Sequence, residues 1–323
     1  MTQSNIQPLA IGIDIGGTGT KFGLVDRDGN VLFSGDMSTK KHGEIESFID
    51  ELYAELSVLI EKAGGIGRMK GIGVGAPNGN FYNGTVEYAP NLPWKGIIPL
   101  AKLIENKFKL PVTLTNDANA AAIGEMMYGA AKGMNDFIMI TLGTGVGSGI
   151  VANGQLIYGH DGFAGELGHT IIIPDGRLHP GTGKKGPLES YASATGVRYT
   201  ALEFLQKTGG GNSLLKDIPE DELDSKKVYE AAIKGDELSK EVFEFTGKIL
   251  GIALANAVMF SSPEAIILFG GLTKSGDLIL KPTRDHMEAN LIQVFQNKVK
   301  LLISHLNEAD AAILGASALI WGK

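Results

Sequence analysis

The sequence contains no cysteine among its 323 residues. Disulfides, thiolate metal sites and cysteine nucleophiles are therefore excluded. Basic residues are also few, since 29 Lys and Arg stand against 36 Asp and Glu, for a net charge of −7. Basic clusters do not exceed pairs such as Lys40-Lys41 and Lys184-Lys185. The charge pattern therefore predicts no nucleic-acid partner.

Long apolar runs are missing as well. No uninterrupted apolar run reaches the ~18 residues that suggest a membrane span, and no charged segment, apolar segment and cleavage site open the chain. We therefore expect no membrane partner and a cytoplasmic location. Glycine, in contrast, is abundant with 45 residues, but without a three-residue period. This excludes collagen and indicates many tight turns.

Two apolar strands run into glycine-rich turns, at Ile11–Thr18 and at Ile140–Ser148. Without a Cβ, glycine lets backbone N–H groups approach a phosphate closely. The turns lack the string of a P-loop and the spacing of a dinucleotide fingerprint. Each opens one half of the chain, so together they predict a nucleotide held between two lobes. The predicted phosphate-binding residues are Gly16, Gly17, Thr18, Gly143, Thr144 and Gly145.

Two aspartates follow predicted strands. Asp14 ends the first strand, where a carboxylate can hold a hydrated Mg²⁺; the alternative is an aspartate that caps a tight hairpin. Asp117 lies in Asn116-Asp-Ala-Asn119 at a strand-to-helix junction. An aspartate there can accept the proton of an alcohol during phosphoryl transfer. It can also be a plain helix N-cap, and the sequence leaves both interpretations open.

A second polar set comprises Glu166, His169 and Glu189. Two carboxylates and an imidazole suit hydrogen bonding to vicinal hydroxyls. The alternatives are surface polarity or a metal site, for which His160 and His179 are the nearest further imidazoles in the sequence.

Apolar periodicity predicts alternating strands and helices. Strands at 9–15, 22–25 and 31–34 are followed by a helix at 46–63, and a similar order begins again after residue 137. This recurrence predicts a duplicated α/β architecture with mixed sheets. Helices are also expected at 97–108, 118–128, 189–207, 226–234, 238–260, 278–295 and 310–321.

The ordered set of motifs resembles the ROK family of repressors, open reading frames and sugar kinases, and within it the glucokinase-like members. The resemblance spans essentially the whole chain. The matching strings are Asp14-Ile-Gly-Gly-Thr18, Asn116-Asp-Ala-Asn119, Leu142-Gly-Thr-Gly-Val-Gly-Ser-Gly149, Gly165-Glu-Leu-Gly-His169, Gly186-Pro-Leu-Glu189 and Phe269-Gly-Gly271.

The resemblance implies an actin-like ATPase (ribonuclease H-like) fold, with two α/β lobes of mixed sheets and an active site in the cleft between them. We expect the small lobe at 1–117 with 306–323, and the large lobe at 118–305. The implied reaction is transfer of a phosphoryl group from ATP, with Mg²⁺, to a hexose hydroxyl. A homodimer is expected.

The resemblance also implies roles for individual residues. Asp117 matches the catalytic base, and Asp14 matches the acid near the metal, which it would meet through water. Gly270 and Gly271 match the loop beside the adenosine. The sugar-binding positions are Asn78, Gly79, Asn116, Glu166, His169 and Glu189.

The chain departs from the family pattern where members usually carry three zinc-binding cysteines. Those places read Pro180, Thr182 and Pro187. Proline and threonine cannot replace thiolates, so the sequence predicts no zinc. Prolines could rigidify this loop instead, by fixing φ. Gly19 is a second departure, since the family often has asparagine there.

The leading hypothesis is an ATP-dependent hexose kinase, with glucose as the first candidate acceptor. Fructose, mannose, allose and N-acetylated amino sugars stay open, as does polyphosphate as donor. A sugar-responsive repressor would need a helix-turn-helix ahead of the first strand, and we expect none in Met1–Pro8. A non-catalytic sugar sensor is the remaining alternative, against which Asp14 and Asp117 argue.

Overall fold

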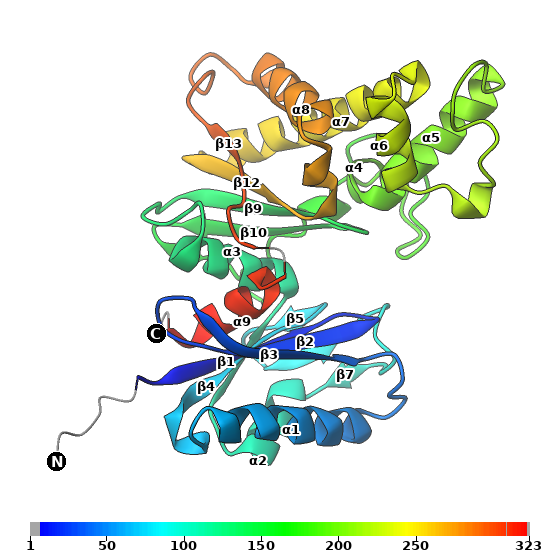
Figure 1. Cartoon of the computed structure of the whole chain (residues 1–323). Coiled ribbons are helices and arrows are strands. Elements are labelled where there is room, and N and C mark those ends of the chain that lie inside the picture. The colour runs from blue at the N-terminus through cyan, green and yellow to red at the C-terminus, as the bar shows by residue number, and fades with distance from the viewer. Residues whose placement is uncertain (1–6, 308, 322–323) are drawn as a thin grey trace. The chain divides into compact units, whose positions relative to one another are not determined.

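The computed structural model describes residues 7–307 and 309–321 (Figure 1). By its internal contacts the chain divides into two compact units. The first unit comprises Met1–Met134, Gly149–Gly165 and Ser304–Lys323, and the second comprises Asn135–Ser148 and Glu166–Ile303. Each has its own apolar core.

A five-stranded mixed sheet forms the centre of the first unit, in the order β3-β2-β1-β4-β8. Its antiparallel part consists of β1 (Leu9–Ile15), β2 (Gly19–Val25) and β3 (Val31–Ser38). On the other side of β1, strands β4 (Met69–Gly75) and β8 (Val112–Thr115) run parallel to it. The carboxyl ends of three strands therefore meet at one edge of this sheet.

Helices cover both faces of this sheet. Helices α1 (Ile45–Lys62) and α2 (Leu100–Phe108) lie on one face and α9 (Ala311–Trp321) on the other (Figure 1). Helix α3 (Asp117–Tyr128) follows β8 directly and packs on α9.

A small sheet in the first unit is absent from the sequence-based prediction. Its strands are β5 (Gly79–Asn80), β6 (Thr85–Glu87) and β7 (Ile97–Ile98), in the order β5-β6-β7. The predicted helix at 97–108 was wrong at its start, because α2 begins only after Pro99. A residue before proline is driven away from helical backbone, which leaves Ile98 extended.

The second five-stranded sheet has the order β11-β10-β9-β12-β13. Its strands are β9 (Phe137–Leu142), β10 (Val146–Ala152), β11 (Gln155–Leu156), β12 (Ala265–Phe269) and β13 (Lys300–Ile303). Here β9, β12 and β13 are parallel, and β10 pairs antiparallel with β11. The two sheets thus have the same arrangement. In each, the strand that comes first in the chain (β1 or β9) has the next two strands on one side and two parallel strands on the other. This confirms the duplicated architecture with mixed sheets.

Five helices are described in the second unit: α4 (Glu189–Ala192), α5 (Ala194–Thr208), α6 (Ser225–Ile233), α7 (Glu237–Ser261) and α8 (Asp277–Asn290). The predicted helix at 189–207 is interrupted at Ser193, whose side chain accepts from Gly196 N and caps α5. The helix predicted at 278–295 ends earlier, at Asn290. Short 3₁₀ turns occur in this unit at 167–169, 220–222 and 271–275, and in the first unit at 66–68.

Helix α7 is long and apolar enough to cross a membrane by length and composition alone. Most of it is buried inside the protein, however, where Phe243, Leu250, Leu254 and Val258 contribute to the core of the second unit. A buried apolar helix of this kind is the core helix of a globular unit.

Candidate active site

Asp14 and Asp117 lie at the edge of the first sheet where three parallel strands end. Asp14 is paired with Gly75 across β1 and β4, and Gly75 with Thr115 across β4 and β8. Gly75 separates the two acids, since a Cβ placed on it would lie 3.6 Å from both Asp14 Oδ1 and the Asp117 Cα. The fold therefore brings together two aspartates that stand far apart in the sequence.

At the junction of β8 and α3, the adjacent residues Asn116 and Asp117 make different contacts. Asn116 is the N-cap of α3, because its Oδ1 accepts a hydrogen bond of 2.7 Å from Asn119 N. Asp117 is the first helical residue and accepts from Ala118 N at 2.8 Å. The capping alternative for Asp117 is thereby answered, since Asn116 makes that contact. Asp117 remains exposed to solvent.

Both carboxyl groups have raised pKa values. Burial desolvates Asp14 and, together with the nearby Asp117 charge, raises its pKa to about 7, while Lys21 acts in the opposite direction. Desolvation by surrounding protein also raises the pKa of Asp117. Since Asp117 is still accessible to water, solvent moderates the shift. Strongly shifted acids of this kind are frequent at functional sites.

The first glycine turn, which connects β1 to β2, is tight and crowded on one side. Gly16 N donates to Gly19 O at 3.0 Å. A Cβ on Gly17 would lie 2.5 Å from the Asn91 carbonyl oxygen, so this position requires glycine for packing alone. Thr18 is exposed at the tip, where its hydroxyl can reach a ligand.

Asn78 and Gly79 lie beside the same sheet edge. Asn78 adopts left-handed backbone with φ of 52°, and its Nδ2 donates to Glu87 O at 2.9 Å. Gly79 packs against the end of β8, since a Cβ there would lie 2.4 Å from Thr115 O. This loop is therefore held next to Asn116.

In the second unit, the two other glycine turns meet at one sheet edge. Strands β9 and β12 are parallel neighbours, and Gly143 and Gly270 directly follow their last residues. Gly270 has φ of 106°, and a Cβ on it would lie 2.6 Å from Leu142 O. Gly143 and Gly271, in contrast, face open space, with no atom within 4 Å of the point where a Cβ would stand. These two positions therefore leave backbone accessible to a ligand.

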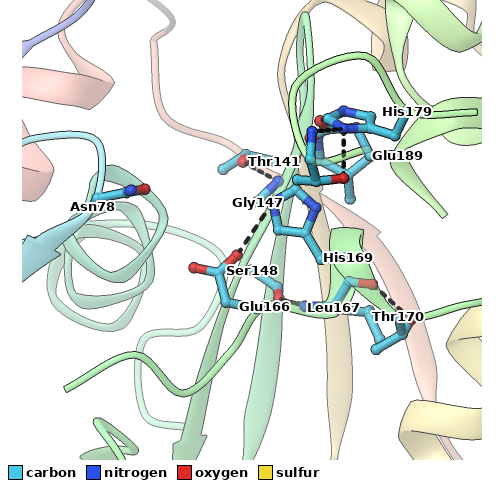
Figure 2. A network of polar contacts seen from close by, with 12 residues as sticks. Asn78, Thr141, Gly147, Ser148, Glu166, Leu167, His169, Thr170, His179 and Glu189 are labelled. Carbon is cyan, nitrogen blue, oxygen red and sulfur yellow. Dashed lines mark hydrogen bonds and ion pairs between the residues drawn. The ribbon is translucent and has the colours of Figure 1, made fainter. Parts of the chain in front are cut away.

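Glu166, His169 and Glu189 also lie in the second unit (Figure 2). His169 Nε2 is 3.8 Å from Glu166 Oε2, and both side chains are about half exposed. Glu189 is more enclosed, because its Oε2 accepts from Val146 N at 2.7 Å. A Cβ on Gly145 would lie 2.3 Å from Glu189 Oε2. Glu189 thus packs directly against the turn that carries Gly143 and Thr144.

His179 is the residue whose contacts sequence reasoning missed, since it was weighed only as a metal ligand. Its Nε2 is 2.7 Å from Glu189 Oε1 (Figure 2). Its Nδ1 is 3.0 Å from Thr182 Oγ1. Thr182 occupies one of the three positions where cysteine is usual in the resembled family. Within the described ranges, no group of three His, Cys, Asp or Glu is placed to hold a metal ion.

Known proteins resemble the whole chain. The model of the ROK family matches residues 10–323. A glucokinase from Halalkalibacterium halodurans is 36% identical over 315 residues, covering 96% of this chain and 94% of its own. A xylose repressor from Caldicellulosiruptor bescii is 31% identical over 313 residues, covering 96% of this chain and 77% of its own.

A solved structure of a ROK family glucokinase from Streptomyces griseus, in complex with glucose and AMPPNP, superposes with a TM-score of 0.80. It is 34% identical, and the match covers 96% of this chain and 98% of that one. ROK sugar kinases have the actin-like ATPase fold, so the predicted fold class is confirmed. The chain belongs to the ROK family.

Proposed function

We propose that this protein is an ATP-dependent hexose kinase that converts glucose to glucose 6-phosphate. The observation that carries the proposal is the placement of Asp117. It stands at the first position of α3, beside the cap Asn116 and across Gly75 from Asp14. The full-length similarity to glucokinases supports glucose as the first acceptor to test.

The glycine turns and Asp14 fit a nucleotide and its metal. Gly143 and Gly271 leave backbone open, and Thr18 is exposed. In its deprotonated form, the Asp14 carboxylate would hold Mg²⁺ through water. When bound, ATP would supply the phosphoryl group and Mg²⁺ would neutralise the charge that develops during its transfer.

Asp117 would accept the proton of the sugar 6-hydroxyl. A raised pKa makes its carboxylate a better base than an ordinary aspartate, and its exposure leaves it accessible to a substrate. The same desolvation makes the charged form costly in the free protein. The carboxylate is therefore poised to take up a proton as the hydroxyl attacks.

The remaining polar residues would bind and orient the sugar. Carboxylates such as Glu166 and Glu189 accept hydrogen bonds from hydroxyls, and His169 can donate or accept. The Asn116 Oδ1 is engaged by the helix cap, so its Nδ2 is the group suited to a sugar oxygen. Asn78 and Gly79 would contribute from the loop beside Asn116.

The test is an ADP-release assay with Mg²⁺ and ATP against glucose, mannose, fructose, allose, N-acetylglucosamine and N-acetylmannosamine. Sugar-dependent turnover is expected, with glucose best. Asp117→Asn should lower kcat by about 10³-fold while sugar binding persists, since a general base contributes 10²–10⁴-fold. Turnover that survives in this variant would contradict the role of Asp117. A repeat with polyphosphate identifies the donor.

A sugar-binding regulator is the second candidate, favoured by the 31% identity to a xylose repressor. It predicts saturable sugar binding without turnover, so the same panel separates the two functions. We further propose a cytoplasmic homodimer without nucleic-acid or membrane partners. Light scattering after size exclusion would test the dimer, and a monomer at micromolar concentration would contradict it.

A further inference from the structure

We propose that His179 is a positioning residue for the sugar site, and that it acts by holding the carboxylate of Glu189. This proposal rests on the proposed function, in which Glu189 binds sugar hydroxyls. Both residues belong to the second unit, and both side chains are largely enclosed, with 16% and 19% of their surfaces exposed.

Both oxygens of the Glu189 carboxylate are held from outside its own helix. Oε2 accepts from Val146 N at 2.7 Å. Oε1 is 2.7 Å from His179 Nε2, a contact drawn in Figure 2. Each carboxylate oxygen has a second lone pair, so a sugar hydroxyl can still donate to it. The two contacts together fix the rotation of the carboxylate, which neither would fix alone.

The environment of His179 decides which ring nitrogen carries hydrogen. Thr182 N donates to Nδ1 at 3.1 Å, and a backbone N–H can only donate. Nδ1 is therefore an acceptor, so the ring hydrogen lies on Nε2 and points at Glu189 Oε1. Thr182 thus sets the tautomer of His179, and His179 in turn orients Glu189.

The loop that carries His179 has its own hydrogen bonds. His179 N donates to Lys184 O at 2.8 Å, and Gly183 N donates to His179 O at 2.9 Å. Gly183 has φ of 66°, which favours glycine at this turn. These backbone hydrogen bonds close the turn between residues 179 and 184 and hold the backbone of His179 in place.

Arg177 anchors the base of this loop to α5. Its guanidinium donates to both Glu203 carboxylate oxygens, at 2.7 and 2.8 Å, and to Thr200 Oγ1 at 3.1 Å. It also stacks on Tyr191, with its carbon 4.6 Å from the ring centroid. These contacts fix the loop independently of His179, so removing the imidazole should release Glu189 without unfolding the loop.

His179 also contacts the imidazole of the predicted sugar set, His169. The rings of His169 and His179 lie edge to face, with centroids 5.6 Å apart. His179 therefore limits the orientation of His169 as well as that of Glu189. Loss of the His179 side chain should therefore lower the affinity for the sugar and leave the affinity for the nucleotide nearly unchanged.

The experiment compares His179→Ala, His179→Gln and a matched control in the full chain. The control is His286→Ala, which removes a similar pair, His286 Nε2 to Glu244 Oε1 at 2.9 Å, between α8 and α7. Glutamine keeps an N–H donor where His179 has Nε2. Steady-state kinetics give kcat and the KM values for sugar and ATP, and calorimetry gives the sugar Kd.

His179→Ala should raise the sugar KM and Kd about 10- to 100-fold, the effect of losing a hydrogen bond to a charged group. The KM for ATP should stay within about threefold. His179→Gln should recover most of the loss, and His286→Ala should match wild type. An unchanged sugar KM in His179→Ala would overturn the proposal. Equal damage by alanine and glutamine, with a lowered Tm, would instead assign a structural role and overturn it too.

The two proposals can fail separately. A wild-type protein that binds sugar without turnover would contradict the kinase, while the sugar Kd of the variants would still decide the role of His179. A wild-type protein that neither binds nor phosphorylates any sugar in the panel would overturn both.

Discussion

Asp14 combines a functional position with an unfavourable environment. Its burial and the nearby Asp117 raise its pKa from 3.8 to about 7, although the proposed reaction needs the anion. Active sites commonly keep such groups at a cost in stability, because they contribute only when the ligand is bound. The proposed role of Asp14 therefore has consequences for both activity and stability.

The first consequence concerns pH and rate. Asp117 accepts a proton only as a carboxylate, and burial raises its pKa. Asp14, whose pKa is raised to about 7, must also be an anion to hold the hydrated metal. The kcat/KM for sugar should therefore fall as the pH is lowered through about 7, and level off above it. A pH–rate profile from about pH 5 to 9 measures this. Asp285→Asn, a surface change beside Lys281, should not alter the profile. Full activity at pH 5 would contradict the assignment.

The second consequence concerns pH and stability. A carboxyl whose folded pKa is raised stabilises the fold when protonated, and this contribution is lost as the pH rises through about 7. Asp14→Asn, which cannot ionise, should therefore melt higher than wild type at pH 8 without ligand. A shift of about three pKa units corresponds to about 4 kcal/mol. Calorimetry at pH 8 and pH 5 should show the difference shrinking on acidification. A variant that melts lower at both pH values would refute this account.

At the scale of elements, α9 depends on glycines in the strands beneath it. A Cβ on Gly73 of β4 would lie 1.8 Å from Ala316 O, and one on Gly12 of β1 would lie 2.2 Å from Ile313 O. Both contacts involve backbone, which cannot rotate away as a side chain can. The helix can therefore lie this close to the sheet only where the strands have no side chain.

Gly73→Ala should consequently displace α9 and destabilise the first unit by about 2–3 kcal/mol or more, the range of overpacked cores. Gly43→Ala is the matched control. No atom lies within 4 Å of the point where its new Cβ would stand, and the φ of Gly43 is not positive. Thermal melts of both variants give the comparison. Equal melting temperatures would show that the sheet and helix separate at little cost.

At the scale of the whole molecule, the chain combines a ROK fold with a loop that lacks cysteine. Hydrogen bonds donated by Arg177, His179 and Thr182 organise this loop, which spans residues 177–187. Proline at positions 180 and 187 also restricts the backbone. The division into lobes at 117/118 and 305/306 stays a prediction, as does the two-lobed active site.

We expect the purified protein to contain no stoichiometric zinc. A zinc-selective chelator should leave both activity and Tm unchanged, since Pro180, Thr182 and Pro187 offer no thiolate. Removing Mg²⁺ should abolish turnover and leave Tm nearly unchanged. Elemental analysis and melting curves measure both effects. One zinc per chain, with a Tm that falls on chelation, would disprove the expectation.

The fold follows in large part from local pattern. The strand at 9–15 matches its predicted bounds, because a short apolar run that ends in a turn leaves little choice. The helix starting at 97 was wrong because Pro99 restricts the residue before it. The small sheet β5-β6-β7 was missed because strands of two or three residues give too short a pattern for periodicity to register.

The sequence by itself determined the glycine turns, the two aspartates at strand ends and the absence of thiolate metal ligands, since residue type and local order suffice for each. Only the tertiary structure decided that Asn116, and not Asp117, caps α3, and that Gly145 and Gly73 are needed for packing. It alone linked His179 to Glu189. These features depend on which atoms long-range packing brings within a few ångströms, and spacing along the chain does not encode that.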